Sequence, residues 1–134
     1  MKGSYILVVF LGIEKEIKIG SLGNLLFSKG YYLYVGSAMG HTGSSTLLSR
    51  IRRHLLNKTK KKIHWHIDYL LADENALISK IYLIPTTISL ECIIARELLD
   101  CCDNFIENFG SSDCNCISHL FYYKKFNSLL DIIK

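Results

Sequence analysis

Five residues from four separate segments could together hydrolyse a phosphodiester bond. Tyr5 and Tyr34 each lie close to a glycine in an apolar run, Arg50 and His54 are four residues apart, and Glu91 lies in a later apolar segment. A tyrosine hydroxyl can take part in proton transfer, and a guanidinium binds phosphate oxygens in a bidentate manner. A lone carboxylate can hold a hard cation such as Mg²⁺. These are the groups that a phosphodiester-cleaving site with one metal ion needs.

Strands are expected to position the two tyrosines. Residues 5–11 are almost continuously apolar and rich in β formers, which predicts a central strand. Residues 31–35 are aromatic and β-branched and are bounded by Gly30 and Gly36, which predicts a second strand. Further strands are expected at residues 16–19, 76–84 and 118–123, and loops at residues 36–45 and 109–116. The early strands can pair as an antiparallel meander.

A helix is expected to carry Arg50 and His54. Residues 46–57 have helical periodicity, and their apolar positions form one narrow stripe made of Leu47, Leu48, Ile51 and Leu55. Residues four apart are neighbours on a helix surface, so Arg50 and His54 lie together on one border of that stripe. Arg50 is then directed across the protein surface towards a phosphate near the sheet. The alternative is that Arg50 pairs with a carboxylate and that His54 caps a helix end.

Glu91 is expected on the apolar face of a second helix. Residues 87–100 form a strong helical pattern in which Ile88, Ile94, Ala95 and Leu98 share a face with Glu91. Burying an unpaired carboxylate is costly, so this side chain should be paired, protonated or bound to a metal ion. Favourable placement in the first helical turn and a salt bridge to Arg50 are the alternatives. Because no second acidic residue obviously joins it, one metal ion is favoured over two.

Composition fits one small globular domain, and the order of the expected elements predicts a mixed α and β fold with a mainly antiparallel sheet flanked by helices. The chain has 134 residues, of which 49% are apolar and 21% are charged. Residues 64–71 are compatible with a short helix or a strand, and residues 126–133 with a C-terminal helix. The longest uncharged apolar run, residues 5–13, is too short to span a bilayer, which argues against a membrane partner.

Cysteine usage indicates a reducing compartment. Five cysteines are an odd count, and Cys101 and Cys102 are adjacent, which argues against a disulfide framework and for the cytoplasm. Cys92, Cys101 and Cys102 are interpreted as small buried residues. Seven basic residues fall within thirteen positions, and the net charge is +4. They predict a phosphate-contacting patch, with a solvated helix end and loop as the alternative; they are Arg50, Arg52, Arg53, Lys58, Lys60, Lys61 and Lys62.

The order of these features resembles the GIY-YIG nuclease superfamily. Gly3-Ser4-Tyr5, Tyr34-Val35-Gly36, Arg50-x-x-x-His54 and a helical Glu91 follow one another over about the first 100 residues. The runs GYYLYVGSA from residue 30, HWHIDYL from residue 64 and FGSSDCNC from residue 109 are similar to an uncharacterised archaeal and bacterial subgroup. Some members of that subgroup are fused to endonuclease III-like proteins.

The resemblance implies a metal-dependent DNA endonuclease that acts in DNA repair or processing. Residues 1–134 would form one GIY-YIG-like domain, with residues 105–134 as a subgroup-specific extension. Tyr5 would activate water beside Tyr34, Arg50 would stabilise phosphate charge, and His54 would support them by a hydrogen bond or proton transfer. Glu91 would bind one Mg²⁺ or Mn²⁺. Because the chain is short, it would obtain its specificity as a homodimer or with a repair-protein partner.

The residues expected to contact nucleic acid lie beside this site and in the basic segment, and they are Gly36, Ser37, Arg53, Lys58, Lys60, Lys61, Lys62, His64, His66, Ser112 and Asp113. His64 and His66 are expected to line the cleft, because both would point the same way from an extended segment.

Two further functions stay open. One is a catalytically inactive module that binds nucleic acid. The other is a small zinc protein, because Cys114-x-Cys116-x-x-His119 offers three soft ligands and His64-x-His66 with Asp68 offers more. The single residue between the two cysteines is shorter than the usual spacing in zinc sites.

Overall fold

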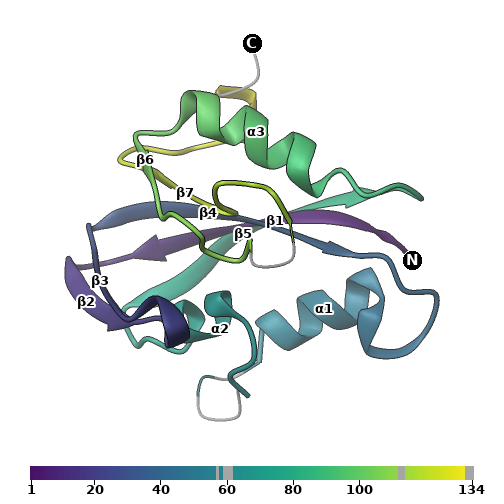
Figure 1. Cartoon of the computed structure of the whole chain (residues 1–134), viewed down its shortest axis with the longest axis horizontal. Coiled ribbons are helices and arrows are strands. Elements are labelled where there is room, and N and C mark those ends of the chain that lie inside the picture. The colour runs from purple at the N-terminus through teal and green to yellow at the C-terminus, as the bar shows by residue number, and fades with distance from the viewer. Residues whose placement is uncertain (57, 59–61, 112–113, 132–134) are drawn as a thin grey trace.

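The computed structural model describes residues 1–56, 58, 62–111 and 114–131. Its centre is a five-stranded antiparallel sheet with the strand order β5-β1-β4-β7-β6 (Figure 1). The predicted fold class, an antiparallel sheet flanked by helices, is confirmed. The five strands are β1 (Gly3–Leu11), β4 (Gly30–Ala38), β5 (Ala76–Pro85), β6 (Asn104–Phe105) and β7 (Leu120–Tyr123).

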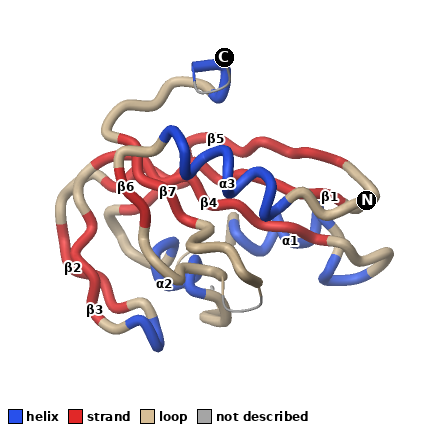
Figure 2. The backbone as a smooth tube through the Cα atoms, turned by 45° about the horizontal axis from the view of Figure 1, so that its top comes forward, coloured by secondary structure: helices blue, strands red, loops and turns tan. Residues whose placement is uncertain are grey.

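Helices cover both faces of this sheet. Helices α1 (Leu47–His54) and α2 (His66–Leu71) lie against one face, and α3 (Glu91–Cys101) lies across the other (Figures 1 and 2). Odd-numbered residues of β1, beginning with Tyr5, belong to the core beneath α1 and α2. The even-numbered residues Ile6 and Val8 belong to the core beneath α3. Burial on both faces explains why β1 is apolar without alternation.

A separate hairpin lies beside the main sheet. It consists of β2 (Lys15–Lys18) and β3 (Asn24–Phe27), joined through a short 3₁₀ turn at Gly20–Leu22. Its buried residues Ile17 and Phe27 extend the core beneath α1 and α2. The expected early meander is therefore wrong, because β1 pairs directly with β4 and β5 while β2 pairs with β3. β3 was not predicted.

Several helix boundaries differ from expectation. α1 ends at His54, and of its expected stripe Leu47 and Ile51 are buried while Leu48 and Leu55 are exposed. α3 begins at Glu91 rather than at residue 87. Two other 3₁₀ turns are Gly43–Ser45 and Leu129–Asp131, the second replacing the described part of the expected C-terminal helix. Among the described residues, no helix combines the length and the apolar character that crossing a bilayer requires.

Candidate active site

Tyr5 and Tyr34 lie side by side because of the register between β1 and β4. Tyr5 is paired with Gly36, and a Cβ atom at Gly36 would lie 2.3 Å from Cζ of Tyr5. The absence of a side chain at Gly36 therefore makes room for the Tyr5 ring. Tyr34 is two residues before Gly36 on the same face of β4, and its ring centroid is 6.4 Å from that of Tyr5.

His54 completes a buried polar pair with Tyr5. The Tyr5 hydroxyl lies 2.8 Å from Nε2 of His54, and both side chains are 2% exposed. The imidazole ring also contacts Tyr34, with 6.2 Å between the ring centroids. Helix α1 positions His54 from its own start, where the Thr46 hydroxyl accepts a hydrogen bond from the Ser49 amide and satisfies one free helix donor.

Arg50 lies at a part of the β4 edge that no strand of the described residues covers. The amide of Val35 donates to the carbonyl of His119, immediately before β7 begins. Ser37 is two residues further along β4, so its carbonyl points in the same direction but lies beyond the N-terminal end of β7. Nη1 of Arg50 donates to this carbonyl at 3.0 Å, and its guanidinium lies 4.7 Å from the centre of the Trp65 ring. Arg50 is thus held at the open part of the β4 edge.

Arg53, which also lies on α1, links this helix to the start of α2. Its Nη2 donates to Oδ2 of Asp68 at 2.8 Å, and its guanidinium lies 4.2 Å from the centre of the Trp65 ring. The same carboxylate oxygen accepts the amides of His64 and Trp65, and Asp68 is fully buried. Asp68 therefore ties α1 to the start of α2.

Glu91 approaches from the opposite face of the sheet. It is the first residue of α3, and the amide of the preceding Leu90 donates to the Ser4 hydroxyl at 3.3 Å, which fixes the helix start beside β1. The Glu91 side chain is 23% exposed, and its Oε1 lies 3.6 Å from Nδ1 of His119. Burial is the main cause of the raised pKa of Tyr5 and Tyr34, and the negative charge of Glu91 adds to it. The charge of Glu91 thus acts on both phenols although α3 and α1 cover different faces.

The surroundings of Tyr5 raise its pKa. Burial raises its pKa above the ordinary value of a phenol, and the positive charge of Arg50 opposes this effect without overcoming it. Burial likewise raises the pKa of Tyr34. Both phenols therefore carry their protons at neutral pH. The charge of Arg50 lowers the Tyr5 pKa, but on its own it does not prepare Tyr5 to act as a phenolate base.

The residues expected to contact nucleic acid are placed differently from one another. Lys58 is exposed, and its ammonium donates to the carbonyls of Leu71 and Ala76, at 2.6 and 2.7 Å, which links this segment to α2 and β5. Lys62 and His64 are exposed. Lys60, Lys61, Ser112 and Asp113 lie outside the described residues.

The two histidines at the start of α2 do not form the expected extended pair. His66 is the first residue of the helix, and its Nδ1 accepts the amide of Gly110 at 2.9 Å. Burial lowers the pKa of His66, which favours the neutral acceptor. His66 thus holds the loop before β7, whereas His64 is exposed beside Trp65.

Cys92 is a residue whose role the sequence interpretation missed. It is half-buried, and its sulfur lies within 4.8 Å of the donor atoms of Cys114, Cys116 and His119. The Cys114-x-Cys116-x-x-His119 pattern was a signal for three members of this cluster. The fourth comes from α3 and is adjacent to Glu91.

Comparison with known proteins places the chain in a family. Residues 4–134 match the family described as Domain of unknown function DUF123. The chain belongs to this family. All the residues that form the candidate site of this DUF123 domain lie within the matched span, from Tyr5 to His119. Searches of curated proteins and of solved structures give no match.

Proposed function

We propose that this DUF123 domain is a metal-dependent endonuclease of the GIY-YIG type, which hydrolyses phosphodiester bonds in DNA. The observation that carries the proposal is the 2.8 Å contact between the Tyr5 hydroxyl and Nε2 of His54. A buried tyrosine and histidine can form such a pair for stability alone. Here, however, a guanidinium and a carboxylate from opposite faces of the sheet both act on the same phenol. Convergence of opposite charges on a proton-transfer pair is typical of a catalytic site.

Glu91 fits the role of ligand to one divalent cation. Mg²⁺ is commonly held by one or two carboxylates together with waters and substrate phosphates. The Glu91 carboxylate is partly exposed, and Oε1 is the oxygen closer to His119. Asp68, the other acid whose charge reaches both phenols, is fully buried and bonded to Arg53 and two backbone amides. When bound, Mg²⁺ or Mn²⁺ would neutralise phosphate charge and acidify a water molecule.

Tyr5 and His54 would move the proton of the attacking water. Because Tyr5 is protonated, its hydroxyl can donate to Nε2 of His54. The phenol oxygen would accept a proton from water while its own proton passes to the imidazole. No free phenolate needs to accumulate, which is consistent with the raised pKa.

Arg50 would bind the phosphate. Its Nη1 is held by the Ser37 carbonyl, and a phosphate at the open edge of β4 would offer stronger, charge-assisted acceptors. A DNA backbone lying along this edge would pass Gly36 and Ser37. The exposed Arg52 on α1 and the exposed Lys62 would add positive charge nearby.

Cleavage of supercoiled and nicked DNA in Mg²⁺ or Mn²⁺ tests the proposal. Glu91→Gln should reduce the rate at least about 100-fold, because it removes the charge that holds the cation while keeping the shape of the side chain. Glu97→Gln is the matched control, since Glu97 is exposed on the same helix. Wild-type rates for both Glu91→Gln and Tyr5→Phe would show that these residues do not form a nuclease site.

A non-catalytic DNA-binding module is the second candidate. The observation that favours it is the exposure of the cations Arg52 and Lys62, which could contact phosphates without any metal ion. It predicts salt-sensitive DNA binding that Glu91→Gln leaves intact. Replacing both Arg52 and Lys62 by alanine should then lower the salt dependence, by about one counterion for each phosphate that the variant no longer neutralises.

A further inference from the structure

Four metal-ligating side chains from two distant segments meet beside α3. Cys92 lies in the first turn of that helix. Cys114 and Cys116 lie in the loop before β7, and His119 is the last residue before this strand. Their donor atoms all lie within 4.8 Å of one another. Within the cluster, Sγ of Cys114 lies 3.3 Å from Nε2 of His119. All five cysteines are free thiols, so no disulfide accounts for the cluster.

The spacing within this cluster matches what a tetrahedral zinc site requires. Zinc–sulfur bonds of about 2.3 Å and zinc–nitrogen bonds of about 2.0 Å separate neighbouring ligand atoms by about 3.5–3.8 Å. Atoms that already lie within 4.8 Å of one another need only small side-chain adjustments to reach that geometry. Three thiolates with one imidazole are a common structural zinc set, and soft thiolate ligands favour zinc over Mg²⁺.

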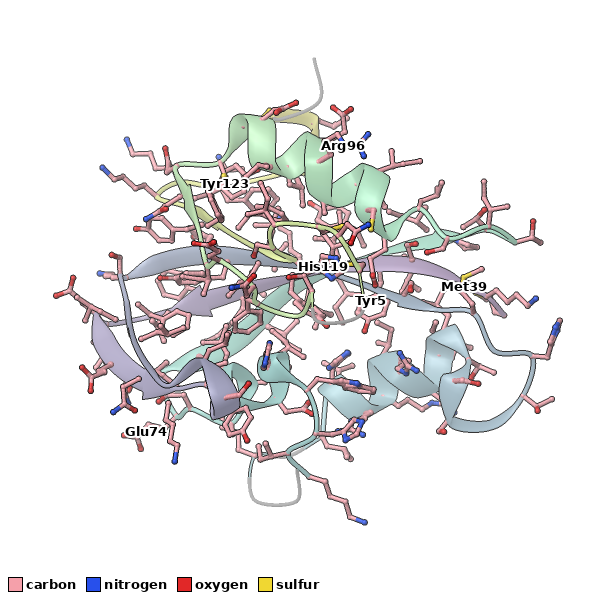
Figure 3. The ribbon with its side chains drawn as sticks, in the orientation of Figure 1. Tyr5, Met39, Glu74, Arg96, His119 and Tyr123 are labelled. Carbon is pink, nitrogen blue, oxygen red and sulfur yellow. The ribbon has the colours of Figure 1, made fainter. Side chains whose placement is uncertain are left out.

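Glu91 lies where a zinc-binding histidine usually has a carboxylate partner, and a small shift of either side chain would bring the two within hydrogen-bond distance. His119 is 2% exposed, its Nε2 faces Cys114, and its Nδ1 lies 3.6 Å from Oε1 of Glu91. A carboxylate that accepts the second ring N–H fixes the tautomer and the orientation of the imidazole. This places Nε2 as the ligand atom. In Figure 3, His119 is labelled at the level of the sheet, between α3 and α1.

The loop that carries the two cysteines is closed by backbone hydrogen bonds and borders a cavity next to α3. The His119 amide donates to the Phe109 carbonyl, and the Asn108 amide to the Ile117 carbonyl, both at 2.8 Å. These bonds tie the two ends of the loop together. Towards α3, a cavity of about 570 Å³ is lined in part by Cys92, Cys114 and Cys116. An ion there would join the loop to the helix.

We propose that Cys92, Cys114, Cys116 and His119 bind one structural Zn²⁺, with Glu91 as the hydrogen-bond acceptor for His119. The fourth ligand comes from α3, which explains how a Cys-x-Cys spacing can serve a zinc site without a second cysteine pair. Because the four side chains fill all four coordination positions of the zinc ion, no position is open for substrate, and the ion has a structural role. The proposal stands independently of DNA cleavage.

Metal content and ligand identity test this directly. Protein purified with reductant and zinc should contain one zinc per chain by elemental analysis. X-ray absorption at the zinc edge should show three sulfur atoms at about 2.3 Å and one nitrogen at about 2.0 Å. Zinc-free reduced protein that stays empty when zinc is added, or a coordination shell other than three sulfurs and one nitrogen, would overturn the assignment.

Cys92→Ser, compared with Cys101→Ser, identifies the ligand on α3. Both cysteines lie on this helix, but Cys101 is exposed and outside the cluster. With Co²⁺ as the probe, Cys92→Ser should lose about one third of the thiolate-to-metal charge-transfer absorbance, or fail to bind, whereas Cys101→Ser should match wild type. Equal spectra for the two variants would exclude Cys92.

If Cys92→Ser fails to fold, the absorption data on wild-type protein still decide the ligand set. Mass spectrometry of unreduced peptides gives an independent check. A disulfide among Cys92, Cys114 and Cys116 in protein kept under reductant would contradict the zinc site. Glu91→Ala should weaken Co²⁺ binding by about 10- to 100-fold, while Glu91→Gln, which keeps an acceptor oxygen, should weaken it less.

Discussion

The ring of Tyr5 lies against the Cα atom of Gly36, its partner across the β1–β4 ladder. A Cβ atom there would lie 2.3 Å from Cζ and 2.4 Å from the hydroxyl oxygen of Tyr5. Gly36→Ala should therefore push the ring aside and lower the free energy of unfolding by about 1–3 kcal/mol. Urea denaturation followed by circular dichroism measures this change.

The matched control for that substitution is Gly12→Ala. A Cβ atom at Gly12 meets its nearest neighbours at an ordinary contact distance of 3.9 Å. The substitution should change the free energy of unfolding by less than about 0.5 kcal/mol. Equal effects at Gly12 and Gly36 would mean that the Tyr5 ring does not occupy the position described.

Tyr5→Phe and Tyr32→Phe separate stability from catalysis. Both phenols are buried; Tyr5 bonds to His54, and the Tyr32 hydroxyl donates to the Ser28 carbonyl at 2.7 Å. Each substitution should lower the free energy of unfolding by about 1–2 kcal/mol. If the proposed nuclease function holds, only Tyr5→Phe should reduce DNA cleavage, by about 100-fold or more. Loss of cleavage in both variants would indicate a general stability effect.

The buried Asp68 carboxylate should be important for stability. One of its oxygens accepts hydrogen bonds from Arg53 and from the amides of His64 and Trp65. Asp68→Asn removes the charge and should lower the free energy of unfolding by about 2–3 kcal/mol. Asp100→Asn, at an exposed position on α3, should change it by less than about 0.5 kcal/mol. Comparable urea midpoints for the two variants would contradict the anchoring role.

Stability should fall at alkaline pH because of buried phenols. The pKa values of Tyr5, Tyr32 and Tyr34 are raised in the folded protein above the ordinary value of 10.0. The folded state therefore holds protons that the unfolded state releases, so their stabilising effect is complete below about pH 10 and is lost as the pH rises further. Each such phenol should contribute a slope of about 1.4 kcal/mol per pH unit in that range.

Ultraviolet absorbance of tyrosinate, measured together with circular dichroism, tests this pH dependence. Ionisation of the buried phenols should coincide with unfolding. Tyr34→Phe should move the midpoint of alkaline unfolding upwards once its stability at neutral pH has been taken into account. Complete ionisation near pH 10 with the fold intact would show that these hydroxyls are exposed to water.

Removing zinc should destabilise the wild-type domain if the proposed site is correct. With free zinc at about 100–1,000 times its dissociation constant, binding adds about 3–4 kcal/mol to the free energy of unfolding. A strong chelator should remove this contribution and increase protease cleavage between residues 109 and 119. Cys92→Ser should respond little to the chelator, because it has already lost a ligand. If the chelator destabilised wild type and Cys92→Ser equally, its effect would not come from a metal ion bound to this cluster.

The sequence predicted the parts of the fold in which local pattern and burial agree. β1 and β4 are long apolar strands, and Glu91 does start the first turn of α3. β3 was missed because its four residues alternate weakly and its stability comes from pairing with β2. The C-terminal residues 126–131 have a helical pattern, but Phe126 packs into the core beneath α3 and only a 3₁₀ turn follows at Leu129–Asp131.

The candidate site was predictable residue by residue but not in its contacts. The order of Tyr5, Tyr34, Arg50, His54 and Glu91 named the components. Their environment depends on long-range geometry that no local pattern contains. The sequence predicts an exposed cation at Lys58, which is correct, but it does not predict the hydrogen bonds from Lys58 to the carbonyls of Leu71 and Ala76. Cys92 reads as a small core residue, and only the approach of the loop before β7 gives it metal-ligating neighbours.

The position of β1 has a consequence for how the chain folds during synthesis. It is the first strand of this sequence, yet its neighbours in the sheet are β4 and β5, and the second of these ends only at Pro85. On the ribosome, one edge of β1 therefore stays uncovered until the chain has emerged as far as Pro85. Such long-range pairing slows folding, and until it is complete the unpaired apolar strand is prone to aggregation. Production of this domain should accordingly benefit from slow translation, low temperature or a chaperone that shields nascent β1.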